Sequence, residues 1–180
     1  MINRIFLIRH ASPNWDMPDI PYHIPPGPPL TAAGRREASQ LGDFLNQEQV
    51  RLLYSSPLER CFHTATIAAS CARARVEVHP GLGELQPGES HDRILSRIWA
   101  VFEFAIRTGR SAERVGLVTH GGTISVLLQA LGMEADRLKH CSIFDHANPV
   151  PPAGVWRVEQ SGTLQPWELR LAFIPGGGQI

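Results

Sequence analysis

The sequence predicts an α/β protein, a three-layer α/β/α sandwich with a mostly parallel central sheet and an antiparallel hairpin at its edge. Short apolar runs alternate along the chain with segments of helical periodicity, which is the pattern of such a fold. Residues 5–8 are apolar throughout, as in a strand buried on both faces of a parallel sheet. A length of 180 residues suits one core. We predict a single domain over residues 1–175, and a flexible tail over 176–180 where three glycines follow one another.

The first strand is followed by a long proline-rich segment and a helix. Seven prolines lie between Pro13 and Pro29, and their fixed φ and missing N–H groups predict a surface loop there. Thr31 has the side chain of an N-cap, and apolar residues at helical spacing after it predict a helix that ends near Asn46.

The second strand is expected at residues 52–54 and leads into a second helix. Ser56, a proline at the next position and Glu59 three residues on have the order of a capping box. We therefore predict that the helix begins there, with Ser56 as its cap, and continues to about Ala72. Alternation at residues 76–78 predicts a third strand.

The second half of the chain repeats this alternation. Apolar residues at intervals of one, three and four over 94–106 predict an amphipathic helix. The apolar run at 115–118 predicts a fourth strand, followed by a helix that extends through Leu131. Residues 156–158 and 167–173 are separated by Ser-Gly and predict the hairpin.

Charge and cysteine content restrict the partners and the compartment. The formal net charge is zero, which gives no indication of nucleic-acid binding or of an anionic membrane surface, so a small soluble ligand is the expected partner. Cys61, Cys71 and Cys141 are an odd number without paired spacing, which favours a reducing compartment. The apolar run near the N-terminus is too short for a signal peptide and no segment approaches a membrane span, so we expect a cytoplasmic protein of undetermined oligomeric state.

Candidate chemical groups follow the predicted strands. The first strand ends in Arg9 and His10, the second leads to Arg60, the third precedes Glu84, and the fourth ends in His120. Open α/β sheets bind ligands beyond the carboxyl ends of their strands. Two arginines, two histidines and a carboxylate at that edge predict a phosphate site with a nucleophile and an acid.

The segments that carry these residues resemble the histidine phosphatase superfamily, which includes cofactor-dependent phosphoglycerate mutases and many small phosphatases. The matching segments occur in the family's order, and they are Leu-Ile-Arg-His-Ala at 7–11, Tyr-Ser-Ser-Pro-Leu-Glu-Arg at 54–60, Leu-Gly-Glu-Leu at 82–85 and Val-Thr-His-Gly-Gly at 118–122.

The resemblance implies a role for each of the five residues. His10 would be the nucleophile that takes the phosphoryl group, and Arg9, Arg60 and His120 would bind its oxygens. Glu84 would act first as general acid and then as general base. The resemblance implies no metal and no organic cofactor. Positive neighbours should also favour the neutral, attacking form of His10.

The chain departs from the family pattern after the first strand. Many members have a threonine and an asparagine that help to bind phosphate, where this chain has Pro13 and Asp16. Asn14 and Asp16 are therefore the candidate accessory substrate-binding residues. The acid is also open to alternatives, because Glu89 and Asp92 occupy the same stretch as Glu84.

The spacing between Glu84 and His120 bears on the reaction. Only 35 residues separate them, which leaves room for little beyond one helix and one strand. We therefore expect this chain to lack the longer substrate-covering insertion of the phosphoglycerate mutases. A mutase must hold its intermediate away from water, so the short segment favours hydrolysis. We therefore predict a metal-independent phosphomonoesterase acting through a phosphohistidine on His10. The alternatives are a phosphoglycerate mutase-type phosphotransferase, a protein phosphohistidine phosphatase, and a non-catalytic phospholigand-binding module.

Overall fold

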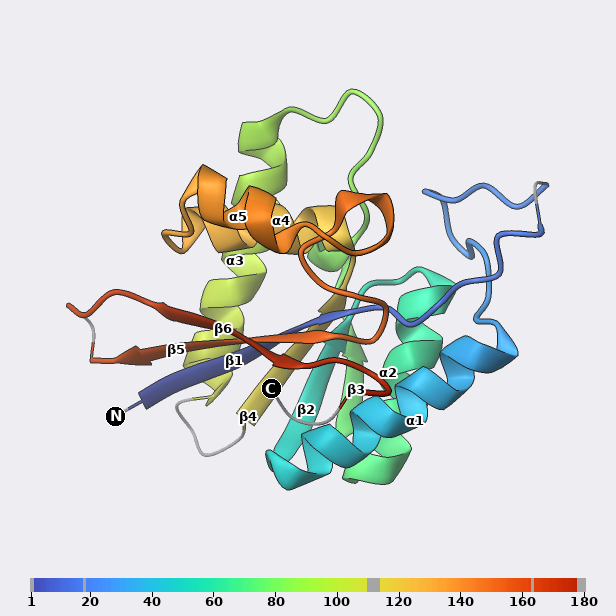
Figure 1. Cartoon of the computed structure of the whole chain (residues 1–180), viewed down its shortest axis with the longest axis horizontal. Coiled ribbons are helices and arrows are strands. Elements are labelled where there is room, and N and C mark those ends of the chain that lie inside the picture. Colours follow the sequence, from blue (N-terminus) through green and yellow to red (C-terminus); the bar gives the residue numbers. More distant parts are fainter. Residues whose placement is uncertain (1, 18, 110–113, 163, 178–180) are drawn as a thin grey trace.

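The computed structural model describes residues 2–17, 19–109, 114–162 and 164–177, and these contain one six-stranded sheet in the order β3-β2-β4-β1-β5-β6 (Figure 1). Strands β3, β2, β4 and β1 pair in parallel. At the other edge, β5 pairs antiparallel with both β1 and β6. The predicted sheet and edge hairpin are thus confirmed. The strands are β1 (Ile2–Arg9), β2 (Val50–Ser55), β3 (Arg75–Val78), β4 (Arg114–Thr119), β5 (Val155–Ser161) and β6 (Glu168–Phe173).

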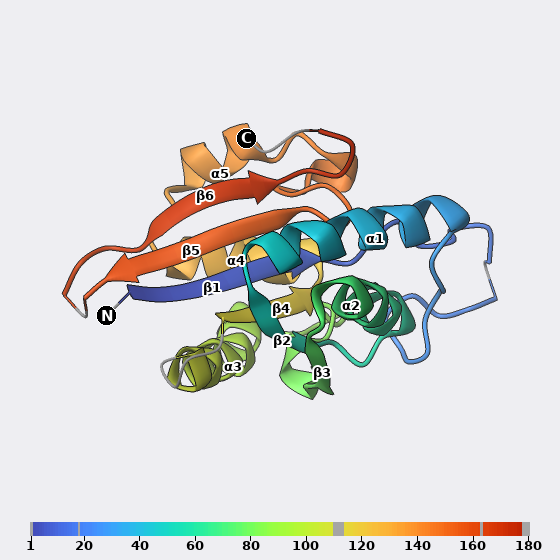
Figure 2. The same cartoon turned by 90° about the horizontal axis from the view of Figure 1, so that it is seen from below.

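Helices cover both faces of the sheet (Figure 2). One face carries α1 (Ala32–Gln47) and α2 (Glu59–Ala72), and the other carries α3 (His91–Gly109), α4 (Gly121–Ala130) and α5 (Ala135–Cys141). Side chains alternate along β1, so Ile5 and Leu7 enter the core under α3 and α4 while Phe6 and Ile8 enter the core under α1 and α2. This double burial explains the unbroken apolar run. No helix within the described ranges is long and apolar enough to cross a membrane.

The predicted cap of the first helix is confirmed, but the predicted cap of the second is wrong. Thr31 accepts a hydrogen bond from the Gly34 N–H at 2.9 Å, as an N-cap does. Helix α2 instead begins at Glu59, its N-cap is Leu58, and no side chain caps it. The Ser56 hydroxyl lies 2.9 Å from His120 Nε2. Ser56 therefore contacts a residue distant in sequence instead of capping the helix as the local pattern predicted.

Helix α5 was not predicted, and the predicted tail is described only in part. Helix α5 has seven residues and buries none of them, so it lacks the periodicity that identifies longer helices. Of the predicted tail, residues 178–180 lie outside the described part of the chain. The Gly176 N–H donates to Gln40 Oε1 at 3.1 Å.

Candidate active site

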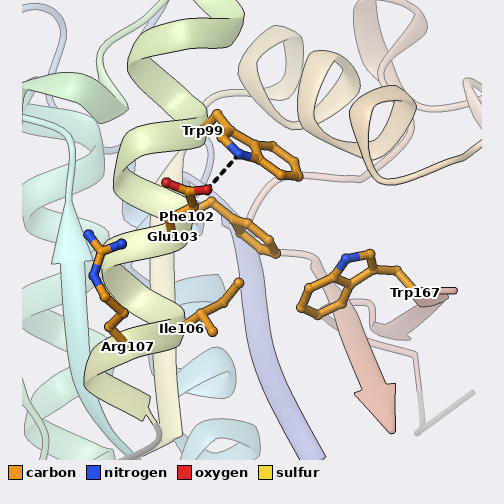
Figure 3. A pocket seen from close by; sticks show the side chains of 6 residues that line it. All are labelled: Trp99, Phe102, Glu103, Ile106, Arg107 and Trp167. Atoms are coloured by element: carbon orange, nitrogen blue, oxygen red, sulfur yellow. Dashed lines mark hydrogen bonds between the residues drawn. The ribbon is translucent and has the colours of Figure 1, made fainter. Parts of the chain in front are cut away.

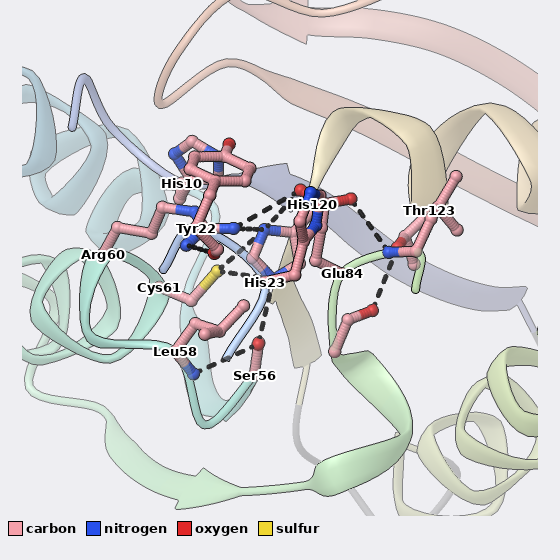
Figure 4. A network of polar contacts seen from close by, with 12 residues as sticks. His10, Tyr22, His23, Ser56, Leu58, Arg60, Cys61, Glu84, His120 and Thr123 are labelled. Carbon is pink, nitrogen blue, oxygen red and sulfur yellow. Dashed lines mark hydrogen bonds and ion pairs between the residues drawn. The ribbon is translucent and has the colours of Figure 1, made fainter. Parts of the chain in front are cut away.

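The parallel strands place their carboxyl ends at one edge of the sheet, where a cavity of about 590 Å³ opens. Arg9 and His10 come from the end of β1, His120 follows β4, and Glu84 follows the 3₁₀ turn η1 (Pro80–Leu82). Arg60, from the first turn of α2, is fully buried beside them (Figure 4). The described lining residues are Arg9, His10, Trp15, Tyr22, His23, Glu84, Leu85, Gly121, Gly122, His146 and Asn148.

His10 is held with one ring nitrogen available. Its side chain is 1% exposed, and Nδ1 lies 2.9 Å from the Ala11 carbonyl oxygen. A carbonyl can only accept, so Nδ1 carries the proton and Nε2 keeps its lone pair. Burial, together with the charges of His120, Arg60 and Arg9, holds the pKa of His10 well below its usual value. The imidazole is therefore neutral, and Nε2 faces the Tyr22 hydroxyl at 3.5 Å.

Arg60 is a fixed cation at the base of this site. One terminal nitrogen donates to the Tyr22 carbonyl oxygen at 2.9 Å, and the other lies 3.4 Å from Glu84 Oε2. The guanidinium carbon lies 3.8 Å from the centre of the Tyr22 ring. Its buried Nε–H has no hydrogen-bond partner among the described residues. Arg60 thus offers a positioned charge and a free donor to an anion.

His120 connects the histidine pair to a hydroxyl and a carboxylate. Its Nδ1 lies 3.2 Å from Glu84 Oε2, and its Nε2 lies 2.9 Å from Ser56 Oγ. Because an ionised carboxylate only accepts, we assign the proton to Nδ1 and let Nε2 accept from the Ser56 hydroxyl. Burial lowers the pKa of His120, although the Glu84 carboxylate opposes that effect. The His10 and His120 rings meet edge to face with centroids 5.3 Å apart.

Glu84 is ionised in this arrangement. Burial raises its pKa, but the hydrogen bond and charge of His120, the Leu85 N–H and the charge of Arg60 outweigh burial and lower it to about 2. An acid must first hold a proton, so Glu84 needs a change in its surroundings before it can donate one. A phosphoryl group bound beside it supplies negative charge, which raises the pKa of a carboxyl.

Arg9 is more fully engaged than the sequence suggested. Its two terminal nitrogens donate to both carboxylate oxygens of Asp145, at 2.6 and 2.8 Å, and one also donates to the Val150 carbonyl at 3.0 Å. Burial raises the pKa of Asp145, but the hydrogen bonds and charge of Arg9 lower it overall. The buried Arg9 Nε–H lacks a hydrogen-bond partner in the described part of the chain, so this group stays available to a ligand.

The other predicted residues lie elsewhere. Asn14 Oδ1 accepts from the Asp16 N–H at 3.0 Å within its own turn, and neither residue lines the cavity. Of the alternative acids, Glu89 forms an ion pair with Arg97 at 2.7 Å, and Asp92 is exposed. Glu84 is the member of that trio that the fold brings to His10.

Several residues that line the cavity or contact its lining were not predicted as site residues. Ser56, which contacts His120, fitted a helix-cap motif, and Trp15 and Tyr22 lie in the proline-rich segment, which matches no motif. Asp145 and His146 belong to the 3₁₀ turn η2 (Asp145–Ala147), whose left-handed backbone at His146, with φ of 54°, has no sequence signature. His23, which also lines the cavity, lies in the same proline-rich segment and is exposed.

The donor set also has the spacing of a metal site. Ligand atoms of His10, Glu84 and His120 all lie within 4.8 Å of one another. Arg60, however, lies 3.2 Å from His120 Nδ1 and 3.4 Å from Glu84 Oε2, so a cation there would face a fixed positive charge. This arrangement suits an anion better, and the absence of a metal cofactor stays a prediction.

Arginines and an unprotonated imidazole at the carboxyl edge of a parallel sheet define a phosphate-handling site. The family model of the histidine phosphatase superfamily (branch 1) matches residues 5–88 and 84–150, and the chain belongs to that superfamily.

Known proteins of similar sequence or structure include both phosphatases and mutases. "Probable phosphoglycerate mutase GpmB" of Proteus mirabilis (strain HI4320) is 27% identical over 201 residues, covering 89% of this chain and 93% of the relative. A mycobacterial glucosyl-3-phosphoglycerate phosphatase superposes with a TM-score of 0.72 at 19% identity, covering 95% of this chain and 98% of that one. A phosphoglycerate mutase from Bacillus anthracis str. Sterne superposes with a TM-score of 0.73 at 16% identity, covering 94% of this chain and 92% of that one. Superfamily membership therefore does not by itself select the reaction.

Proposed function

We propose that the protein is a metal-independent phosphomonoesterase that works through a phosphohistidine on His10. The observation that carries the proposal is the setting of that side chain, which lines the cavity with Nδ1 2.9 Å from the Ala11 carbonyl oxygen and Nε2 3.5 Å from the Tyr22 hydroxyl, while burial lowers its pKa. An unprotonated nitrogen beside fixed cations is what phosphoryl transfer requires.

In the first step, Nε2 attacks phosphorus and the bond to the leaving oxygen breaks. Arg60 and the Nε–H of Arg9 stabilise the charge on the phosphoryl oxygens, and the Nδ1–H of His120 joins them once it turns from the protonated Glu84 to the phosphoryl group. Glu84, protonated once the anionic group has bound, gives its proton to the leaving oxygen. In the second step, Glu84 takes a proton from water, the water oxygen attacks phosphorus, and the P–N bond breaks. His10 then returns to its neutral state and phosphate leaves.

Hydrolysis is favoured over mutase chemistry by the short segment between Glu84 and β4. Between Glu84 and β4 the described chain forms only the helix α3, which packs against the sheet core through residues such as Ile98 and Phe102. A mutase would have to retain its phosphoenzyme in the presence of water. Phosphorus NMR of the products separates the two, since hydrolysis yields inorganic phosphate and a mutase yields a rearranged ester.

The proposal is tested by hydrolysis of a small phosphomonoester in the presence of a chelator. We expect turnover by the wild type, an acid-labile phosphoenzyme, and loss of both in His10→Ala and His10→Asn, whose folding is checked by circular dichroism. His140→Ala is the control, because His140 is exposed on α5 and contacts the Asp136 carbonyl. Full turnover in the His10 variants, or turnover abolished by the chelator, contradicts the proposal. Phosphate binding without turnover favours the binding-module alternative.

A further inference from the structure

Aromatic rings form one wall of the cavity above His10. Trp15 and Tyr22 stack with centroids 4.8 Å apart and planes 15° apart, and His146 lies 5.5 Å from Trp15. Below Tyr22 lies the guanidinium of Arg60. The stack therefore runs from the buried cation to the rim of the cavity (Figure 4 shows its inner end, Tyr22 with Arg60).

The outer end of this stack is available to a ligand. Trp15 is 53% exposed although it lines the cavity, so a large apolar ring faces the space through which a substrate enters. Flat rings bind to such a surface by offset or edge-to-face contact, and each good pair adds binding free energy beyond the buried area. Because the Tyr22 hydroxyl lies 3.5 Å from His10 Nε2, a group attached to the reacting phosphoryl would lie beside these rings.

Charge around the rim is poorly suited to a second anionic group. Arg9 is the only arginine or lysine among the described residues that line the cavity. Both of its terminal nitrogens donate to the Asp145 carboxylate. The Asp145 carboxylate, which is bound to Arg9, would repel a further negative charge. A carboxylate or second phosphate on the substrate would find no free cation at this rim.

We infer that Trp15, Tyr22 and His146 form a subsite for a planar, uncharged leaving group, so that the preferred substrates are phosphomonoesters of alcohols carrying an aromatic ring. The inference rests on the proposed function, and it adds the substrate class. Trp15 supplies the exposed face of the subsite, Tyr22 supports that face from below, and His146 borders it.

Benzyl phosphate and cyclohexylmethyl phosphate test the inference as a matched pair. Both esters release a primary alcohol on a six-membered ring, both carry the same charge, and they differ in ring planarity. We expect the wild type to favour benzyl phosphate in kcat/KM by about fivefold, the size of one good ring contact. In Trp15→Leu the ratio should fall toward one. A wild-type ratio near one, or a ratio unchanged in Trp15→Leu, overturns the inference while leaving hydrolysis itself established.

A second tryptophan offers the control. Trp99 is partly exposed and lines a separate cavity of about 310 Å³ with Phe102 and Trp167 (Figure 3). Its indole N–H donates to Glu103 at 3.1 Å, and none of the lining residues of that cavity belongs to the site described above. Trp99→Leu should therefore keep the wild-type ratio.

Binding of phosphonates makes the test independent of turnover. Benzylphosphonate and cyclohexylmethylphosphonate cannot be hydrolysed, and calorimetry gives their affinities for the full chain. We expect the benzyl compound to bind the wild type about fivefold more tightly and the difference to vanish in Trp15→Leu. Equal affinities in the wild type contradict the subsite. Absence of turnover with a retained binding difference contradicts the proposed hydrolysis but supports the subsite.

Discussion

The contact between Ser56 and His120 is the clearest case of one side chain that sets the state of another. The Ser56 hydroxyl donates to His120 Nε2 at 2.9 Å, and this leaves Nδ1–H to meet Glu84. A histidine is a useful phosphate ligand only in a fixed orientation and tautomer, and here a buried serine provides both.

Ser56→Ala should therefore lower kcat/KM about fivefold, the usual value of one buried hydrogen bond. Loss of the donor also makes the neutral form of His120 less favourable, so the acidic limb of the pH profile should move to higher pH. Steady-state kinetics between about pH 5 and pH 8, a range that spans the ordinary histidine pKa, measure both effects. Ser142→Ala, whose hydroxyl donates to the Leu138 carbonyl, is the control. An unchanged rate and profile would show that Ser56 does not position His120.

The sequence predicted which five residues the fold brings together better than it predicted their partners. Arg9, His10, Arg60, Glu84 and His120 were identified because each follows a strand in a segment that resembles a known family. Asp145, the carboxylate that occupies Arg9, lies 136 positions away, and no local pattern joins the two. Partner choice of this kind depends on loop geometry, which periodicity does not specify.

At the scale of elements, the first turn of α1 packs closely against the segment that follows β1. Gly34, in the first turn of α1, packs against the Ser12 backbone. A Cβ at Gly34 would overlap the Ser12 carbonyl oxygen and lie 3.1 Å from the Ser12 N and C atoms. Backbone atoms cannot move aside as a side-chain end can, so this contact fixes the helix relative to the segment that carries His10.

Gly34→Ala should lower the free energy of unfolding by about 2 kcal/mol, the usual cost of overpacking, despite the better helix propensity of alanine. Urea denaturation measures the change. Arg35→Ala, at an exposed position of the same turn, should change stability by less than about 0.5 kcal/mol. Equal stabilities of Gly34→Ala and the wild type would show that the Ser12 segment adapts freely.

The 3₁₀ turn η2 places a carboxylate where the substrate must bring an anion. Asp145→Asn removes that negative charge while keeping the side chain's shape, so inorganic phosphate should inhibit hydrolysis with about threefold tighter binding (an exposed-pair effect of about 0.7 kcal/mol). Inhibition constants at low and high salt measure the effect, which should shrink as salt increases. Asp136→Asn on α5 is the matched control. Weaker phosphate inhibition in Asp145→Asn would instead assign Asp145 to the positioning of Arg9.

The elements themselves were largely predictable, and the exceptions share a cause. β1 has an unbroken apolar run because both of its faces are buried, and the helix α3 has strong apolar periodicity because one of its faces packs on the core. The start of α2 was misassigned because Ser56 is used by His120, and α5 was missed because it buries no residue. Local patterns predict an element when burial decides its structure, and they fail when a distant contact or an exposed surface does.

At the scale of the whole molecule, the site concentrates buried ionisable groups in one place. His10, Arg60 and His120 are almost completely buried, and burial, together with the charge of Arg60, lowers the pKa values of the two histidines. Such groups link the stability of the entire fold to pH, because the unfolded chain titrates them at their ordinary values.

Acidification should destabilise the protein before its carboxylates titrate. The pKa values of His10 and His120 are lowered in the folded state by burial, so below about 6.5, the ordinary value, the unfolded chain binds protons that the folded chain does not. The free energy of unfolding therefore falls as pH decreases from about 6.5 toward the lower folded values, by up to about 1.4 kcal/mol per pH unit for each histidine. Glu84, with its pKa lowered to about 2, adds a second decrease between about 4.5 and 2.

Urea denaturation at pH 7.5, 6.5 and 5.5 tests this linkage (values chosen to bracket the ordinary histidine pKa of about 6.5). The double variant His10→Gln/His120→Gln carries no titrating imidazole at the site, so its unfolding free energy should depend less on pH over that interval, whatever its absolute stability. His91→Gln, at an exposed position of α3, should keep the wild-type slope. If the double variant and the wild type lose stability in parallel, the histidines must titrate alike in the folded and unfolded states, and the neutral nucleophile on which the mechanism depends would have to be abandoned.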